Sequence, residues 1–189
     1  MPDPPGDPRC DFSAFVFEKG RAFEAGVLRH IEALARVYAV PGDGPAHSMS
    51  LAACDDTFAA MRRGEEVIYQ GVLRNPANQT YGAPDFLIRS DVLHRLFPDA
   101  LTGEEARIPA PALGGGPWHY RVVDVKFTNL QLDARWEAGN DHLPYKVQVW
   151  LYNEALGRIQ GYLPGHAYLL GRGWKKGTNE AGSDSCMDR

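Results

Sequence analysis

The spacing of apolar residues predicts two helices in the first third of the chain. Residues 20–40, GRAFEAGVLRHIEALARVYAV, carry apolar side chains at intervals of three and four, as one face of a helix does: Phe23, Val27, Ile31 and Leu34. The prolines at positions 41 and 45 end this pattern. A second helix is expected over residues 51–64, where Gly64 is a suitable stop.

Beyond residue 64 the pattern changes to short apolar runs bounded by turn residues, which is typical of strands. Four segments are predicted as strands: 66–74, 84–91, 120–127 and 167–172. A turn-rich loop, NPANQTYGA, separates the first two, and residues 98–117, with four prolines and four glycines, are interpreted as a surface excursion. A helix over residues 144–156 precedes the last strand. This order predicts an α/β or α+β domain with a central mixed four-stranded sheet flanked by helices.

Length and composition indicate one domain. The chain has 189 residues, of which 44% are hydrophobic, enough for one sizeable core. We expect residues 12–174 to form this domain, and we expect the polar segments 1–11 and 175–189 to be flexible tails. No run of about 18 apolar residues occurs, and the first residues do not resemble a secretory signal. The expectation is a soluble, intracellular, cytoplasmic protein with no membrane partner.

Charge and cysteine content narrow the function classes. The net charge of −4 gives no general attraction to nucleic acid, so such a role requires a local basic surface. The candidates are Arg62 with Arg63, Lys146 with Arg158, and the segment from Arg172 to Lys176. The three cysteines, Cys10, Cys54 and Cys186, are far apart and form no CxxC pair, which argues against a disulfide framework. HExxH, GxSxG and P-loop motifs are absent from the sequence.

One predicted strand carries two opposite charges. In YRVVDVKFTN, residues 120–129, the valines and Phe127 are typical of a buried strand, yet Asp124 and Lys126 interrupt it. Because they are two residues apart, both side chains point to the same face of the sheet. This strand alone is compatible with a solvated ion pair as well as with a functional site.

Other residues with suitable chemistry occur on neighbouring predicted elements. Glu24 lies beside the apolar stripe of the first helix, and Asp85 follows Pro84 where a strand begins. Gln148 and Tyr152 are four residues apart and therefore share one helix face, to which Tyr145 adds. Taken singly, each has an ordinary interpretation as a surface glutamate, a turn aspartate or a packing residue.

Taken in order, these motifs resemble a known nuclease family. Pro84-Asp85, then Asp124-x-Lys126, then Gln148-x-x-x-Tyr152 are similar to the motifs of the PD-(D/E)XK nuclease superfamily, the last resembling its RecB-like branch. The resemblance spans residues 19–173, and residues 144–173 are especially similar to RecB-like nucleases of large DNA viruses. It implies a restriction-endonuclease-like core and a Mg²⁺-dependent DNA nuclease, an exonuclease or end-processing enzyme of DNA repair, recombination or replication. For a viral gene the compartment would be the host cell.

The resemblance also implies roles for individual residues. Asp85, Asp124 and the carbonyl of Val125 would hold Mg²⁺, for which Mn²⁺ could substitute, because hard cations prefer oxygen ligands. Lys126 would orient the attacking water or offset charge on the phosphate. Glu24 would complete the metal site; many RecB-like members use an upstream histidine instead, and the chain departs from that pattern if Glu24 is the match. Glu18, Glu32 and His30 remain alternatives. Gln148 and Tyr152 would position the lysine, the water or the DNA backbone.

The resemblance also implies which partners to expect, and it leaves alternative functions open. DNA is the expected partner, and a helicase or recombination protein is a further candidate. Some relatives hold an iron-sulfur cluster with four thiolates, which three scattered cysteines do not reproduce, so no cluster is expected. The alternative is a catalytically inactive nucleic-acid-binding domain of the same fold, and a purely structural domain is a third possibility. The motifs leave open DNA or RNA preference, exonuclease or endonuclease action, the number of metal ions and the oligomeric state.

Overall fold

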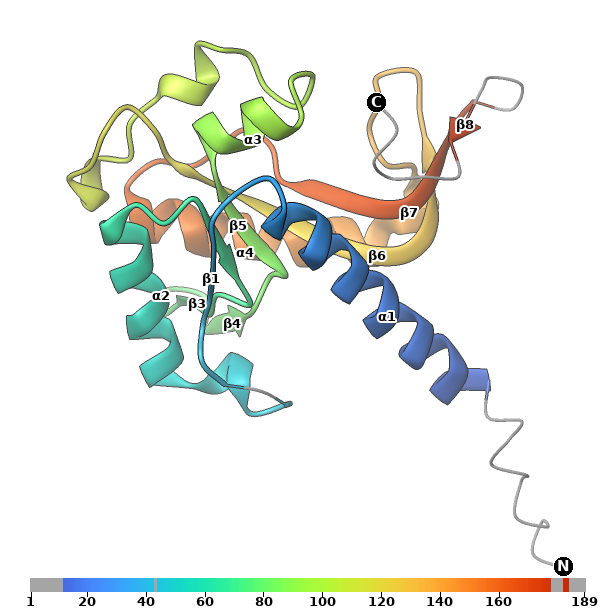
Figure 1. The fold of residues 1–189 in the computed structure, drawn as a ribbon, viewed down its shortest axis with the longest axis horizontal. Helices are drawn as coiled ribbons and strands as arrows, with labels where there is room; N and C mark the ends of the chain where they lie inside the picture. The colour runs from blue at the N-terminus through green and yellow to red at the C-terminus, as the bar shows by residue number, and fades with distance from the viewer. Residues whose placement is uncertain (1–11, 43, 178–181, 184–189) are drawn as a thin grey trace, which may run out of the picture.

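The computed structural model describes residues 12–42, 44–177, 182 and 183. They form a mixed sheet with helices on both faces (Figure 1). The helices are α1 (Phe12–Glu32), α2 (Leu51–Arg63), α3 (Ser90–Leu96) and α4 (Leu143–Gln160), with 3₁₀ turns η2 (His47–Met49), η3 (Glu105–Arg107), η4 (Pro111–Leu113) and η5 (Asn140–His142). The strands are β1 (Val37–Ala39), β2 (Val67–Tyr69), β3 (Leu73–Asn75), β4 (Thr80–Gly82), β5 (Phe86–Arg89), β6 (Tyr120–Leu132), β7 (Tyr168–Lys176) and β8 (Gly182–Ser183). The mixed α/β class expected from the sequence is therefore confirmed.

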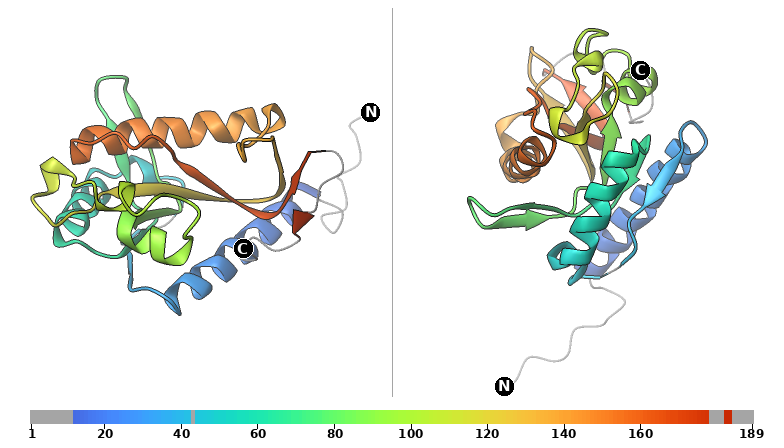
Figure 2. Two further views of the ribbon diagram at one scale, coloured as in Figure 1. Left: turned by 90° about the horizontal axis from the view of Figure 1, so that it is seen from above. Right: turned by 90° about the vertical axis from the view of Figure 1, so that its left-hand side faces the viewer.

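The main sheet has six strands in the order β1-β2-β5-β6-β7-β8, and β3 and β4 form a separate two-stranded hairpin. β1 and β2 are parallel, as are β6 and β7, whereas β5 is antiparallel to both of its neighbours, β2 and β6. α4 connects the parallel pair β6 and β7 and lies on the opposite side of the sheet from α1 (Figure 2).

Side chains along the central strands point alternately to the two faces of the sheet, which produces two apolar cores, one on each face. Ile68, Leu87 and Val122 face one way, into a core with residues of α2 and α4. Their neighbours Val67, Phe86 and Val123 face the other way and pack with residues of α1 and α3. Since both faces are covered, a charged residue on a central strand is buried.

β6 and β7 continue well beyond the short strand β5. The pairing of β5 with β6 ends at Phe86 and Val123, whereas β6 stays paired with β7 as far as Leu132 and Lys176. We call residues 125–132 and 170–176 the β6–β7 extension. α1 crosses this extension on one face of the sheet (Figure 1).

The first predicted helix differs from the observed one at both ends. α1 occupies residues 12–32, and residues 37–39, which were expected to be helical, form the edge strand β1. The amide of Leu34 bonds to the Ile31 carbonyl at 2.9 Å, an i→i−3 contact that tightens the last turn. Val37 and Tyr38 are residues that favour strands, and pairing with β2 prevails over helix propensity there. The second predicted helix is confirmed as α2, and Gly64 follows it with a φ of 72°.

The predicted strand 66–74 is also wrong as one element. It breaks into β2 and β3 at Gln70, whose φ is 54°, and Gly71, and β3 turns away to pair with β4. The predicted strand 84–91 ends at Arg89, because Ser90 begins α3. The observed main sheet has two strands more than the four predicted. The additional strands are β1 and β8, which are too short to produce a periodic pattern in the sequence. Of the predicted tails, residues 1–11 lie outside the described residues; residues 175 and 176 belong to β7, and 182 and 183 form β8.

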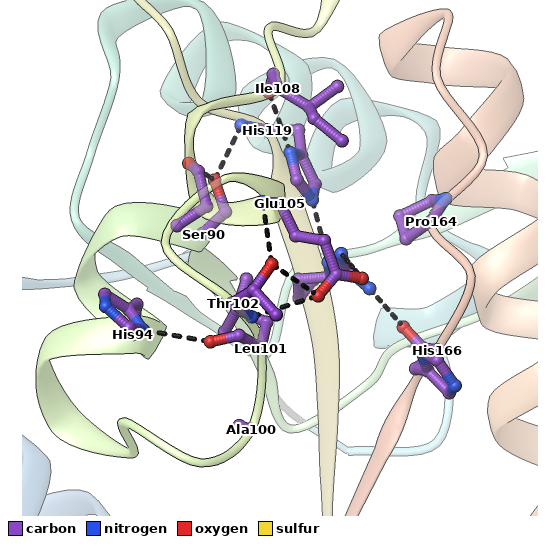
Figure 3. A network of polar contacts seen from close by, with 12 residues as sticks. Ser90, His94, Ala100, Leu101, Thr102, Glu105, Ile108, His119, Pro164 and His166 are labelled. Carbon is purple, nitrogen blue, oxygen red and sulfur yellow. Dashed lines mark hydrogen bonds and ion pairs between the residues drawn. The ribbon is translucent and has the colours of Figure 1, made fainter.

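The predicted excursion, residues 98–117, is anchored to the sheet by a polar network (Figure 3). Ser90 Oγ donates to the Ala106 carbonyl at 2.7 Å and accepts from the His119 amide at 3.1 Å. The His119 ring lies between the Ile108 carbonyl, 2.8 Å from Nδ1, and Nε of the fully buried Arg121, 2.7 Å from Nε2. Burial, with the positive charge of Arg121, lowers the pKa of His119 to about 4. A neutral imidazole that donates from Nδ1 and accepts at Nε2 fits both contacts.

Candidate active site

The candidate site lies where β2 ends, β5 begins and β6 continues beyond its pairing with β5. A cavity of about 310 Å³ occurs there. Glu24 of α1, Asp85 just before β5 and Lys126 of β6 all line it, together with Arg21, Val125 and Phe127. Three residues that the sequence motifs placed on separate elements therefore meet at one cavity.

Asp85 is held in this cavity by two hydrogen bonds. Its Oδ2 accepts from the backbone N–H of Val125 at 2.7 Å, and its Oδ1 accepts from Nε2 of Gln70 at 3.1 Å. Burial, followed by the negative charges of Asp124 and Glu24, raises the pKa of Asp85 to about 8, although the bond from Val125 opposes this. At neutral pH a carboxyl group with this pKa is mostly protonated, and a positive charge placed next to it would favour the ionised form.

Asp124 and Lys126 form a buried ion pair on the α4 side of β6. Asp124 Oδ2 and Lys126 Nζ are 2.5 Å apart, and their side chains are 2% and 19% exposed. Burial raises the pKa of Asp124 although Lys126 opposes it. For Lys126, burial lowers the pKa, but the charges of Asp124 and Asp85 outweigh it and the net shift is upward. The pair is thus buried rather than solvated, and Lys126 is an ammonium.

Glu24 is the acidic residue of α1 that lies at the cavity. Its Oε1 accepts hydrogen bonds from the hydroxyl of Tyr69 at 2.7 Å and from Nε2 of Gln70 at 2.9 Å. The alternatives Glu18, His30 and Glu32 are exposed on α1 and do not line this cavity.

Gln70 is a member of the site that the sequence motifs missed. Its side-chain amide nitrogen donates hydrogen bonds to Glu24 and to Asp85, and it therefore lies between the two carboxyl groups. The sequence does contain one indication of its role. Gln70 is the single polar residue in VIYQGV and stands immediately before Gly71, where an apolar strand ends. Its φ of 54°, rare for a residue with a side chain, points its amide to a position that regular strand geometry does not reach.

α4 contributes aromatic and amide groups next to the charged residues. The ring of Tyr145 lies 5.4 Å from Lys126 Nζ. Gln148 Nε2 donates to the Tyr152 hydroxyl at 2.8 Å. Burial raises the pKa of Tyr152, and the charges of Asp124 and Asp85 add to this effect, which places the phenol near both carboxylates. A Cβ at Gly82 would overlap the Tyr152 ring, so the glycine lets the β3–β4 hairpin approach it.

The donor set fits a hard divalent cation. Among the described residues, no three His, Cys, Asp or Glu side chains already converge as a metal site. However, burial and neighbouring negative charges raise the pKa of Asp85, and burial raises the pKa of Asp124 although its Oδ2 is paired with Lys126. A cation would favour the ionised form of both carboxyl groups. The Val125 carbonyl adds a further oxygen, since the N–H and C=O of one strand residue point to the same side.

Comparison of the chain with protein-family models, with curated proteins and with solved structures finds no match. In the described part of the chain, no helix has both the length and the apolar character that crossing a membrane requires. Of the three cysteines, Cys54 is half-buried and free, and Cys10 and Cys186 lie outside the described residues. Function is therefore inferred from the geometry of the cavity together with the motif order.

Proposed function

We propose that this domain is a Mg²⁺-dependent nuclease that hydrolyses phosphodiester bonds in DNA, with the restriction-endonuclease-like core of the RecB-like PD-(D/E)XK enzymes. The observation that carries the proposal is the meeting of Glu24, Asp85 and Lys126 at one cavity, with Asp124 paired to the lysine. An apolar, doubly covered sheet has no structural need for two aspartates and a lysine at this place, because burying charge costs stability.

The carboxylates are the groups that would hold the cation. Asp85, Asp124 and the Val125 carbonyl offer oxygens from two adjacent strands, and Glu24 offers another from α1. Mg²⁺, or Mn²⁺ in its place, would polarise the phosphate and make a bound water acidic enough to attack at neutral pH. The amide of Gln70 must move aside for Glu24 and Asp85 to act together.

Lys126 is suited to donate hydrogen bonds and not to accept a proton. Its pKa is raised by Asp124 and Asp85, so it remains an ammonium. Asp124 holds Nζ on one side, and the Tyr145 ring lies 5.4 Å from it on α4. From there the ammonium can orient a water and offset the negative charge that develops on the phosphate. Tyr152, held by Gln148, supports this arrangement by hydrogen bonding near the same charges.

The alternative is a nucleic-acid-binding domain of the same fold without cleavage. Gln70 favours it, since its amide satisfies Glu24 and Asp85 in the absence of a cation. The buried carboxylates favour the nuclease, because they repel phosphate and a binding surface alone does not need them. Under the nuclease proposal the enzyme processes DNA ends in repair, recombination or replication, and a helicase or recombination protein would deliver the substrate.

Incubation with DNA of different topology tests the proposal. Purified protein is mixed with linear single-stranded, linear duplex and circular DNA in Mg²⁺, Mn²⁺ or EDTA. Cleavage of linear substrates that depends on metal supports an exonuclease, and cleavage of circles indicates an endonuclease. Binding of DNA with no cleavage in either metal would select the inactive domain.

A further inference from the structure

Aromatic rings paired with cationic side chains follow the β6–β7 extension. Arg172, Trp174 and Lys176 are two residues apart along β7 and therefore share one face. The Arg172 guanidinium lies 5.4 Å from the ring centroid of Phe127, the β6 residue next to Lys126. Further along, Trp174 packs edge-on against Trp136 at 5.2 Å, and both tryptophans line a second cavity of about 540 Å³.

A second aromatic–cationic pair, on α1, lines the 310 Å³ cavity of the candidate site. The Arg21 guanidinium lies 5.9 Å from the ring centroid of Phe17, and both residues line the cavity with Phe127. Phe17 is 68% exposed and Phe127 is 37% exposed. Phe23 of α1 packs behind Phe127 with ring centroids 5.8 Å apart, which fixes the ring. Phe17, Arg21 and Phe127 line the cavity together with the charged residues of the candidate site, and Arg172 lies against Phe127. We call these four residues the aromatic–basic rim.

This rim matches the chemistry of single-stranded nucleic acid. Proteins that bind single strands use aromatic rings on which bases stack and cationic side chains that follow the phosphates. Guanidinium groups suit phosphate because they can donate two parallel hydrogen bonds. The bases of an intact duplex are paired and stacked on each other, so they cannot offer a face to Phe127 unless the duplex opens. The cavity, about 310 Å³, is at the small end of ligand sites and has the scale of a nucleotide unit, not of a double helix.

We propose that this rim binds single-stranded polynucleotide, with a base stacked on Phe127 and the flanking phosphates on Arg172 and Arg21, and that it leads an unpaired end to the carboxylates. The substrate class rests on the proposed nuclease function. The binding itself is measurable without cleavage, so the two can fail separately.

The test is fluorescence anisotropy in EDTA with a labelled oligothymidylate and with a blunt duplex of equal length. Phe127→Ala is expected to weaken single-strand binding about 10- to 100-fold, the loss typical of one stacked base. Phe127→Trp keeps an aromatic face and is expected to stay within about threefold of the wild type. Phe58→Ala is the matched control, because Phe58 is also 37% exposed but lies on α2, and it is expected to change nothing. Duplex binding is expected to be the same for all of these proteins.

Arg172 gives an independent measurement. Arg172→Gln is expected to reduce the salt dependence of single-strand binding by about one unit in the slope of log affinity against log salt. Arg107→Gln, which removes an exposed arginine from η3, is expected to leave the slope unchanged. An unchanged slope for Arg172→Gln would remove this residue from the phosphate contacts.

The outcomes separate the inference from the nuclease proposal. Equal loss of single-strand and duplex affinity in Phe127→Ala, or no loss, overturns the stacking site even if the enzyme cleaves DNA. Selective loss in a protein that cleaves nothing supports the stacking site and removes the nuclease. Should Phe127→Ala lower the melting temperature, Phe127→Leu replaces it, since leucine still packs on Phe23 but offers no aromatic face; binding like the wild type would overturn the proposal.

Discussion

The backbone N–H of Val125 donates a hydrogen bond of 2.7 Å to Oδ2 of Asp85. This bond joins the start of β5 to the strand that carries Asp124 and Lys126. It orients the Asp85 carboxylate toward β6 at the point where β5 begins, and Asp124 is close enough for its negative charge to raise the pKa of Asp85. The candidate site depends on this contact between residues 40 positions apart.

Removing either aspartate is expected to abolish metal-dependent cleavage. Asp85→Asn and Asp124→Asn each lose a cation ligand, so the single-turnover rate should fall at least about 100-fold while circular dichroism stays unchanged. Asp55→Asn, on the exposed face of α2, is the control and should cleave like the wild type. Near wild-type turnover in either site variant would remove that residue from the mechanism.

Lys126→Ala separates catalysis from metal binding. The rate should fall by about two orders of magnitude, roughly 3 kcal/mol of transition-state stabilisation, because the ammonium acts near the phosphate. Stabilisation by Mn²⁺ in a thermal melt should survive, whereas Asp124→Asn should lose it. Lys146→Ala on α4 is the control, since its Nζ donates to the Ala138 carbonyl and lies outside the cavity. Normal cleavage by Lys126→Ala would contradict the mechanism.

Glu24→Gln is expected to have a smaller effect than the aspartate variants. It should raise the Mg²⁺ concentration needed for half-maximal activity, because Glu24 lies at the cavity but is shared with Tyr69 and Gln70. Glu32→Gln, at the exposed end of the same helix, should behave as the wild type. The reverse result would show that a different turn of α1 supplies the acidic group.

Gln70→Ala is expected to bind Mn²⁺ more tightly than the wild type. The amide of Gln70 competes with a cation for Glu24 and Asp85, and its removal leaves both carboxylates without that donor. In both proteins the apparent affinity should increase as pH rises toward 8, because a proton on Asp85, whose pKa is about 8, competes with the metal. Isothermal titration calorimetry at two pH values checks both statements; weaker binding by Gln70→Ala would make Gln70 a ligand or an essential support.

His119 is expected to make the protein less stable in mild acid. Its pKa is about 4 in the folded protein and near 6.5 when exposed, so the unfolded state binds more protons between these values. The stabilisation is complete above pH 6.5 and is lost as pH falls toward 4. Asp85, with a raised pKa, acts in the opposite direction throughout this range, so the comparison is made in an Asp85→Asn background. Urea unfolding of that protein should become easier between pH 6.5 and 5, and less so after His119→Gln.

Local periodicity accounts for what could be predicted of the fold. α2, β6 and α4 follow from apolar spacing, because intervals of two, three and four residues are set by strand and helix geometry. Segments governed by distant pairing could not be predicted in this way. Val37–Ala39 is a strand only because β2 lies beside it, and Gln70 interrupts a run of strand-forming residues because the chain must leave the sheet there.

For the site, the sequence by itself determined which side chains share a face. Asp124 and Lys126 lie two residues apart on one strand, and Gln148 and Tyr152 lie four apart on one helix, so their proximity is a consequence of covalent spacing. Only the tertiary structure decided that Gln70 lies between Glu24 and Asp85, and that Arg172 lies over Phe127. These pairs come from separate elements, and their distances depend on how α1, β2, β5 and β7 pack against β6. The raised pKa of Asp85 has the same origin, because burial and neighbouring charges exist only after the chain has folded.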